Sequence, residues 1–377
     1  MAKLFICGDL LNNVTTQNFF SSNIREQIQK VDYSIANFEA PIETNFEPIK
    51  KAGPHKKQKK ETIPILKEIG FDLLLLANNH IFDYGKEGLK STLDECHKNS
   101  IKTIGAELSF EKAYEPLIVN IKEFKFGFIN ASEAQFGALT TNESESGYAW
   151  INHKRINETV IHLKEVESVD YIIFFAHAGL EHYDIPLIEW RNRYRELCDL
   201  GADCVIGSHP HVPQGYEKYG EKMIFYSLGN FYFPKKDNQD KIEHGYSLIL
   251  DFQKDSSISF EMVYHTVNNN VISRIDSKDS IIDFKSLNSK LEEDKYNKLI
   301  ELIYSDAYEK ICYPYYASVF NTVVDSDGVY IKIKKLIKQI LYQKRNQEHR
   351  EILLYHLTKN ETYRYITLNA IRNKFNL

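Results

Sequence analysis

Short apolar segments alternate with amphipathic segments from the N-terminus to about residue 265 of the chain. The apolar segments resemble buried strands, and the amphipathic segments repeat apolar residues at the spacing of a helix. We predict strands at Leu4–Cys7, Tyr33–Asn37, Leu73–Ala77, Thr103–Gly105, Leu117–Ile121, Phe126–Asn130, Tyr171–Ala176, Cys204–Gly207, Lys222–Ser227, Tyr246–Phe252 and Ile258–His265. We predict helices at Asn18–Gln29, Glu61–Ile69, Lys86–Asn99, Ile156–Glu165 and Pro186–Leu200. This alternation predicts a layered α/β domain with much parallel sheet, and the last strands, which lack intervening helices, predict an antiparallel part.

The character of the sequence changes after about residue 268. An Asn-rich run and an Asp/Ser/Lys-rich stretch up to about Asp283 predict a linker. Helical periodicity follows at Phe284–Cys312 and Tyr330–Thr358. We therefore predict two domains, an α/β domain at residues 1–267 and a helical extension at residues 284–377.

The composition narrows the classes of function. The chain has 377 residues, of which 43% are hydrophobic and 26% charged, and its net charge is -5. It is therefore not basic throughout, as many nucleic-acid-binding proteins are. Residues 330–377 nevertheless contain 11 Lys or Arg against 3 Glu. That bias is typical either of a solvated helix face or of a surface that docks on an acidic partner, polymer or membrane.

The cysteines and the apolar segments indicate in which cellular compartment the protein is expected. The five cysteines show no CxxC spacing, which favours buried reduced thiols over a metal or redox pair. The N-terminus, MAKLFICGDLL, reads as a strand, because Asp9 interrupts an apolar run that is too short for a signal peptide. No run of about 18 apolar residues occurs, so we expect no membrane span. These features predict a cytoplasmic protein or one peripheral to the membrane.

Polar residues with metal-binding chemistry follow five of the predicted strands. They are Asp9; Asn37 and Glu39; Asn78, Asn79, His80 and Asp83; His177 and Glu181; and His209 and His211. Ligands of α/β proteins bind beyond the carboxyl ends of parallel strands, so we expect these side chains to meet at one edge. His209 and His211 flank a proline and point the same way in an extended segment, which suits a metal or an anion.

The mixture of ligand types indicates which metal would bind. Imidazole, carboxylate and amide groups without thiolate fit a hydrolytic centre containing one or two ions of Mn, Fe or Zn. Asp83 and Glu181 are candidates for groups that orient the ligands. The sequence therefore predicts a divalent metal site at the edge of the sheet.

Six segments in a fixed order resemble a known family. They are GDLL, NFEAPI, LANNHIFDYG, HAGLEHYDIP, GADCVIGSHPHVPQGYE and FYSLGNFYF. In these segments the chain resembles the CapA family of capsule-synthesis proteins, which is associated with poly-γ-glutamate and surface polysaccharides. That family is similar in fold to the calcineurin-like metallophosphatases, so the resemblance implies a layered α/β/β/α sandwich. It covers roughly residues 3 to 265 and leaves the C-terminal extension outside.

The resemblance also implies roles for individual residues. The metal ligands would be Asp9, Glu39 as the bridging carboxylate, Asn79, His177, His209 and His211. His80 would be the general acid or a charge stabiliser, and Asp83 and Glu181 would support it in catalysis. Leu11 stands where a further histidine ligand is expected, which implies one tightly and one weakly bound ion, or a degenerate site.

Three functions are compatible with these features. The first is a metal-dependent hydrolase acting on a phosphoester or on an amide bond of a polymer. The second is a non-catalytic assembly or export factor that binds an anionic polymer such as poly-γ-glutamate, within a membrane-associated biosynthesis complex. The third, a nucleotide phosphodiesterase or nuclease, fits the acidic net charge least, and we expect no nucleic-acid partner.

Two features leave alternatives open. The run AGPHKKQKKET, which contains Lys56, Lys57, Lys59 and Lys60, is either a mobile solvated loop or a basic flap over an anionic substrate. Asn230 follows the apolar segment MIFYSL, where it would form a buried turn or belong to the site.

Overall fold

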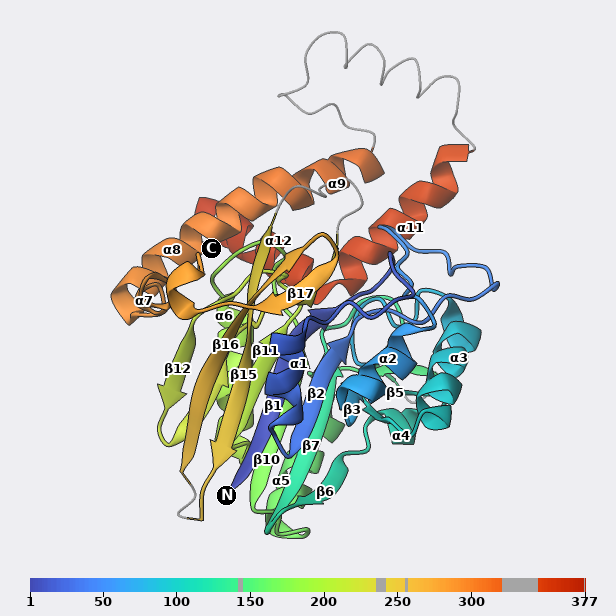
Figure 1. The fold of residues 1–377 in the computed structure, drawn as a ribbon. Helices are drawn as coiled ribbons and strands as arrows, with labels where there is room; N and C mark the ends of the chain where they lie inside the picture. Colours follow the sequence, from blue (N-terminus) through green and yellow to red (C-terminus); the bar gives the residue numbers. More distant parts are fainter. Residues whose placement is uncertain (142–144, 235–241, 255–256, 321–344, 376) are drawn as a thin grey trace. The chain divides into compact units, whose positions relative to one another are not determined.

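The computed structural model describes residues 1–141, 145–234, 242–254, 257–320, 345–375 and 377 (Figure 1). The chain forms two compact units. The first comprises Met1–Pro48 and His55–Glu292, and the second comprises Ile49–Pro54 and Glu293–Leu377. The predicted division into domains at residues 1–267 and 284–377 stays a prediction.

The larger sheet of the first unit has β1 (Ala2–Leu10) near its centre. Its strand order is β17-β16-β15-β1-β2-β3-β4, and β14 also pairs with β1. Because β1 is parallel to β2 and antiparallel to β15, the predicted parallel and antiparallel parts meet at this strand. The other strands are β2 (Tyr33–Phe38), β3 (Leu73–Leu75), β4 (Lys102–Ile104), β14 (Asn230–Tyr232), β15 (Glu243–Phe252), β16 (Ile258–Asn268) and β17 (Val271–Arg274).

The second sheet has the order β12-β13-β11-β10-β7-β6. Its four inner strands are parallel, so their carboxyl ends lie at one edge, and the outer strands β6 and β12 are antiparallel. The strands are β6 (Leu117–Ile121), β7 (Phe124–Ser132), β10 (Tyr171–His177), β11 (Cys204–Ser208), β12 (Tyr216–Tyr219) and β13 (Lys222–Phe225). A small third sheet consists of β5 (Ala106–Glu107), β8 (Ala138–Leu139) and β9 (Gly147–Ala149).

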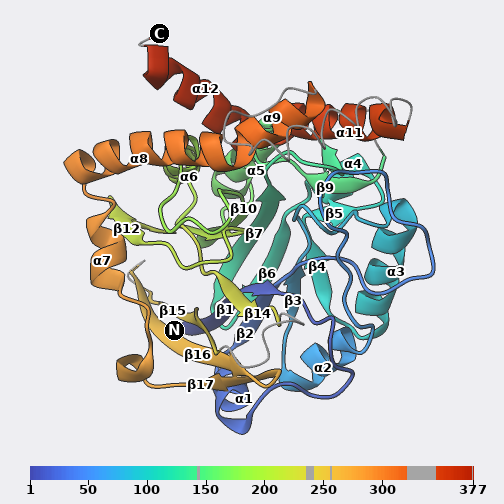
Figure 2. The same ribbon diagram turned by 90° about the horizontal axis from the view of Figure 1, so that it is seen from above.

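Two apolar clusters hold the sheets and helices in layers. Successive strand residues point to opposite faces, so Leu4 and Ile6 enter the cluster between the sheets, whereas Phe5 and Cys7 enter the cluster under the helices. Figure 2 shows the succession of α1 and α2, the β1–β2 sheet, the β7–β10 sheet, and α5 and α6. The predicted α/β/β/α sandwich is thus confirmed. The helices are α1 (Ser22–Gln29), α2 (Thr62–Ile69), α3 (Gly85–Lys98), α4 (Phe110–Ala113), α5 (Lys154–Glu165), α6 (Ile188–Leu200) and α7 (Phe284–Ser289), with a 3₁₀ turn at Ser277–Asp279.

The end of β1 carries a β-bulge that determines where Asp9 points. The pairing with β2 shifts between Cys7 and Asp9, so Gly8 is an extra residue opposite that strand. Cys7 and Leu10 both face the helices, although residues three apart in a regular strand face opposite sides. Asp9 consequently faces away from the helices. Glycine is required at this bulge, because a Cβ on Gly8 would lie 2.0 Å from the carbonyl oxygen of Gly229.

The second unit is helical. Its elements are α8 (Glu293–Ala307), a π-helical turn (Tyr308–Cys312), α9 (Tyr313–Val319), α11 (Arg345–Lys359) and α12 (Glu361–Phe375). Val319, Leu353 and Leu357 are buried together in its core. The side chain of Asn360 accepts a hydrogen bond from the Tyr363 amide at 2.8 Å and so caps α12. No helix among the described residues is both long and apolar enough to cross a membrane.

Most predicted elements of the first unit are confirmed, and the differences have local causes. The linker predicted up to Asp283 is wrong at its start, because Val271–Arg274 pair with β16 and Ile272 is buried. The third sheet was not predicted, because its strands are too short to show an alternating pattern. The helix predicted at Tyr330–Thr358 lies outside the described residues as far as residue 344, and α11 covers the rest. The five cysteines are buried and unpaired, as predicted.

Candidate metal centre

The carboxyl ends of β1, β2, β10 and β11 bring the predicted ligands together. Asp9 is on β1, Glu39 directly follows β2, and His177 ends β10. His209 and His211 follow β11, and both have positive φ angles, 96° and 59°, so the backbone turns sharply there. The premise of an extended His209–His211 segment is therefore wrong, although the turn still brings both rings to the site.

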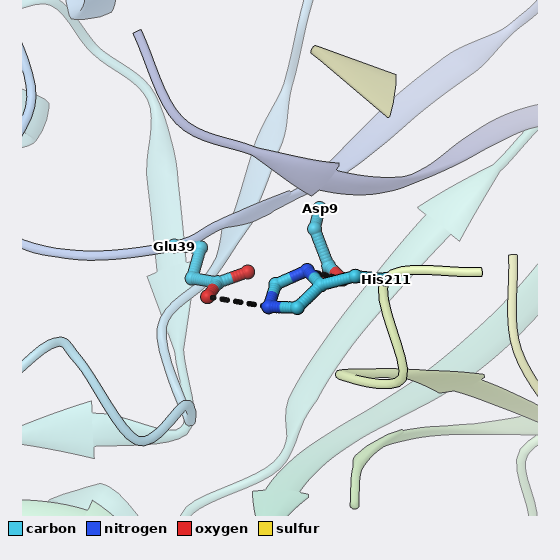
Figure 3. Close-up of side chains that lie close together, drawn as sticks. All are labelled: Asp9, Glu39 and His211. Carbon is cyan, nitrogen blue, oxygen red and sulfur yellow. Dashed lines mark ion pairs between the residues drawn. The ribbon is translucent and has the colours of Figure 1, made fainter. Parts of the chain in front are cut away.

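Asp9, Glu39 and His211 form the first part of the site, called the Asp9 group below. One ligand atom from each of them lies within 4.8 Å of the others, and Figure 3 shows the His211 ring between the two carboxylates. The Nδ1 atom of His211 is 3.2 Å from Asp9 Oδ2, and its Nε2 atom is 3.7 Å from Glu39 Oε1. Asn230 also reaches this ring, since its Oδ1 lies 2.9 Å from His211 Nδ1. Asn230 is therefore a site residue rather than only a turn residue.

Glu39 is the most unusual member of the Asp9 group. Its side chain is fully buried, and among the described residues neither carboxylate oxygen has a hydrogen-bond partner. Leaving such a group buried without a partner costs about 1–3 kcal/mol, and more when it is charged. Burial, reinforced by the neighbouring carboxylates Asp9 and Glu181, raises the pKa of Glu39 to about 8, against the opposing effect of His211. The metal-free site therefore holds a proton on Glu39 at neutral pH.

His211 balances the charge of the Asp9 group. Burial by itself lowers the pKa of His211, but Glu39 and Asp9 outweigh it and raise the pKa to about 10. The Asp9 carboxylate, at 3.2 Å, is the direct partner of the imidazolium. Without an ion, His211 is thus charged and Glu39 protonated at neutral pH.

Asn79, His177 and His209 form the second part of the site, called the His177 group below. His177 Nε2 lies 3.1 Å from Asn79 Oδ1. On its other side, His177 Nδ1 lies 3.0 Å from Ser208 Oγ and 3.2 Å from Asn37 Nδ2. Asn37 also donates to Asp9 Oδ1 at 2.7 Å and so links the two groups.

The imidazoles of the His177 group remain neutral at pH 7. Burial, reinforced by the neighbouring histidines, lowers the pKa of His177 well below its usual value. Burial also lowers the pKa of His209 to about 4, although Glu181 and Asp9 oppose it. The rings of His177 and His209 lie 4.7 Å apart between centroids. Neutral imidazole is the form that binds a metal, so these two side chains are ready to act as ligands.

His80 and Asp83 form a hydrogen-bonded pair near the ligands. His80 Nδ1 lies 2.8 Å from Asp83 Oδ2, and both side chains are largely buried. The same carboxylate oxygen accepts a hydrogen bond from the backbone amide of Lys56 at 2.7 Å. Asp83 therefore fixes the orientation of the His80 ring.

Glu181 is close to the histidines without joining the Asp9 group. Burial by itself raises the pKa of Glu181, but His209, His211 and His80 outweigh it and lower the pKa. The carboxylate therefore stays charged among these rings. Leu11, in contrast, is buried with Ala40 and Phe233 in a small apolar cluster. Residue 11 thus contributes packing and no ligand atom.

Sequence reasoning did not identify Glu133. This residue follows β7 and is fully buried, with its Oε1 3.7 Å from His209 Nε2. It accepts hydrogen bonds from Gln135 Nε2 at 2.7 Å and from the Gly179 amide at 3.3 Å. Its position at the end of an apolar strand could have identified it, because Asp9 was identified from the same kind of position.

The chemistry of the donor set fits a divalent ion. The oxygens of Glu39 and Nδ1 of His209 are buried polar atoms without hydrogen-bond partners in the described part of the chain. His177 Nε2 and Asn79 Oδ1 are hydrogen-bonded at 3.1 Å, a contact that an ion between them would replace. Asp9, Glu39 and His211 are the group whose spacing would hold an ion, and the wider ligand set with Asn79, His177 and His209 stays a prediction.

The sequence of this chain is similar to those of bacterial capsule-synthesis proteins. The family model described as bacterial capsule synthesis protein PGA_cap matches residues 3–235. The capsule biosynthesis protein CapA of Bacillus anthracis is 30% identical over 231 residues, which are 60% of this chain and 56% of that protein. The PGA biosynthesis protein CapA of Bacillus subtilis (strain 168) is 32% identical over 209 residues, which are 54% and 53% of the two chains. The chain therefore spans about half the length of these relatives.

Solved structures give a more distant comparison. A hypothetical protein from Thermus thermophilus aligns with a TM-score of 0.45 and 14% sequence identity, over 70% of this chain and 99% of that chain.

Proposed function

Because the chain belongs to the family of bacterial capsule synthesis proteins PGA_cap, we propose that it is a metal-dependent hydrolase in capsule or surface-polymer biosynthesis. Its substrate is then an amide bond of an anionic polymer such as poly-γ-glutamate, or a phosphoester. The names of the two CapA relatives support the polymer context.

One observation carries this proposal. Asp9, Glu39 and His211 present ligand atoms within 4.8 Å of one another, and both oxygens of the buried Glu39 lack a hydrogen-bond partner in the described structure. A cation at this position would offset the free-energy cost of burying the Glu39 carboxyl group without a hydrogen-bond partner. The chemistry that a bound divalent ion supplies is the activation of water at neutral pH and the polarisation of the bond to be cleaved.

His80 supplies the proton chemistry in this proposal. The Asp83 carboxylate, 2.8 Å from Nδ1, orients the ring and stabilises a positive charge on it. A histidine held in this way acts as a general acid that protonates the leaving group. Glu181 helps to hold the charged His211 in place through its negative charge.

A second function is favoured by a specific observation. Leu11 fills an apolar cluster at the position where the resemblance implies another histidine ligand. With one ligand fewer, the site suits a non-catalytic assembly or export factor that binds an anionic polymer, with or without an ion.

Metal analysis of protein purified without chelator separates the two functions. We expect about one or two equivalents of Mn, Fe or Zn in the wild type and a loss of most of this metal in His209→Ala. His162→Ala is the matched control, since that histidine is exposed on α5. In parallel, wild-type protein is tested for release of amino groups from γ-linked oligoglutamate and of phosphate from a panel of phosphoesters.

The outcomes point in different directions. Metal that is lost only in His209→Ala, together with turnover that is lost in parallel, supports the hydrolase. A wild-type protein that takes up no metal even after reconstitution, but binds the polymer, favours the assembly factor instead.

A further inference from the structure

The lysine-rich segment at residues 55–60 is anchored to the site. The buried side chain of Gln58 donates to the backbone carbonyls of Glu39 and Ala40, at 3.2 and 3.3 Å, and accepts from the Asn12 amide at 3.0 Å. The backbone of Gln58 also pairs with residues 41 and 43. The base of this run is thus tied to the residues that carry Glu39, which favours the interpretation as a basic flap over that as a mobile solvated loop.

The four lysines of this segment fall into two classes. Lys59 and Lys60 are paired with carboxylates, at 3.1 Å from Glu43 and 3.2 Å from Glu95. Lys56 and Lys57 have no such ion pair among the described residues. Each of their ammonium groups instead lies 5.5 Å from the centroid of an aromatic ring.

Lys56 differs from Lys57 in the ring that it covers. The Lys56 ammonium lies over Phe233, and the Phe233 ring lies 4.9 Å from the ring of His211. Its backbone amide is bound to Asp83, and its charge acts on the buried Glu39. Lys57, in contrast, lies over Tyr84 at the start of α3. Lys56 therefore places a half-buried cation, with no carboxylate partner among the described residues, beside the metal ligands.

We propose that Lys56 binds an anionic group of the substrate, namely a carboxylate of an acidic polymer next to the bond that the site holds. This inference rests on the proposed function, because it names the substrate class of the same site. An ammonium that is fixed over an aromatic ring and lacks a carboxylate partner can form a charge-assisted hydrogen bond with an incoming anion.

A singly charged carboxylate suits this position better than a phosphate dianion. Two fully buried carboxyl groups, those of Asp9 and Glu39, lie together in the site beside this position. A second negative charge on the ligand is repelled by these carboxylates, whereas one ammonium balances one carboxylate. Free phosphate and phosphate polymers also carry anionic oxygens that an ammonium group binds. The experiment must therefore distinguish these ligands from a carboxylate polymer.

The test compares variants that remove the same charge from the same segment. Metal content and the affinity for γ-linked oligoglutamate are measured on the full chain for wild type, Lys56→Gln, Lys57→Gln and Lys56→Arg, by calorimetry at low and high salt. The methyl ester of the oligomer, inorganic phosphate and short-chain polyphosphate serve as comparison ligands. We expect Lys56→Gln to weaken oligoglutamate binding about tenfold, Lys57→Gln by less than about twofold, and Lys56→Arg to retain most of the affinity.

Metal content distinguishes a failure here from a failure of the proposed function. Unchanged metal with equal affinities in Lys56→Gln and Lys57→Gln overturns the role of Lys56 and leaves the metal centre standing. A tenfold loss confined to Lys56→Gln supports the inference even if the wild type holds no metal. Preference of the wild type for polyphosphate over oligoglutamate, or equal binding of the methyl ester, overturns the assignment of a carboxylate.

Discussion

The two halves of the candidate centre differ in how well their polar atoms are satisfied. In the His177 group, both ring nitrogens of His177 have partners within 3.2 Å, and burial keeps the imidazole neutral. In the Asp9 group, both oxygens of Glu39 are buried without a partner in the described structure, and His211 carries a positive charge. His177 is thus fully hydrogen-bonded without an ion, although Nδ1 of His209 is not, whereas in the second arrangement both oxygens of a carboxyl group lack a partner.

This difference indicates which half binds an ion more tightly. A cation at the Asp9 group gains the attraction of two buried carboxylates and displaces protons from Glu39 and His211. At the His177 group, an ion must first break the contact between His177 and Asn79, 3.1 Å apart. We therefore expect one tight ion at the Asp9 group and a weaker ion at the His177 group.

The largest expected effect concerns the two histidines of these halves. His211→Ala should lower the affinity for the tight ion by more than about 100-fold, because even changes outside the direct ligands cost about 10–100-fold. His177→Ala should leave about one equivalent bound. Metal titration of chelator-treated protein measures both values, and equal losses in the two variants would remove the distinction between the halves.

A smaller effect tests whether His80 and Asp83 act apart from metal binding. Asp83→Asn keeps the shape of the side chain but removes the charge that stabilises a protonated His80 ring. We expect turnover to fall about 10–100-fold, within the range for a general acid, while the metal content stays at the wild-type value. A parallel loss of metal would show that Asp83 supports the ligands instead, and the pH profile of kcat in the variant separates the two roles.

The smallest effect is a pH dependence of the metal-free protein. Glu39 and His211 have folded-state pKa values of about 8 and about 10, above their ordinary values of 4.5 and 6.5. The folded state therefore holds more protons than the unfolded state between about pH 6.5 and 8, so the free energy of unfolding falls as pH rises. Each group contributes at most about 1.4 kcal/mol per pH unit.

Denaturant unfolding of chelator-treated protein at pH 6.5 and 8 measures this effect. Glu39→Gln should flatten the slope and raise the stability at pH 8, since an amide has no proton to lose. Apparent metal affinity should change in the opposite sense and increase over the same interval, because the ion competes with protons for the ligands. A stability that increases with pH in this window would contradict the assigned charges.

The pattern of the sequence predicted the layers of the first unit and pointed to polar residues that the structure gathers at one edge, but not the contacts that hold them there. The apolar runs that became β1, β2, β10 and β11 were clear because both faces of these strands are buried. Alternation alone could not predict the bulge at Gly8, since it depends on contact with Gly229, far away in the chain. Likewise, the hydrogen bonds of Gln58 depend on carbonyl groups that only the folded chain places nearby.

The candidate ligands are visible in the sequence for a different reason. Asp9, His177 and His211 interrupt apolar strand ends with side chains that would be costly to bury without a partner, and such positions stand out in a sequence. Glu133 occupies an equivalent position after β7. It was overlooked because Ala131 and Ser132, which precede it, are small or polar, so the sequence shows no abrupt step from apolar to polar residues there. The charge states of Glu39 and His211 depend on mutual distances and required the structure.

The close approach of Gly8 to Gly229 also makes the centre sensitive to a residue that offers no ligand atom. The backbone amide of Asp9 donates to the carbonyl oxygen of Gly229 at 3.0 Å, and Asn230, the next residue, reaches the His211 ring. A Cβ at residue 8 would have to displace that carbonyl group and would therefore shift Asp9 and Asn230 together. A single methyl group at residue 8 would thus disturb the centre without changing any ligand.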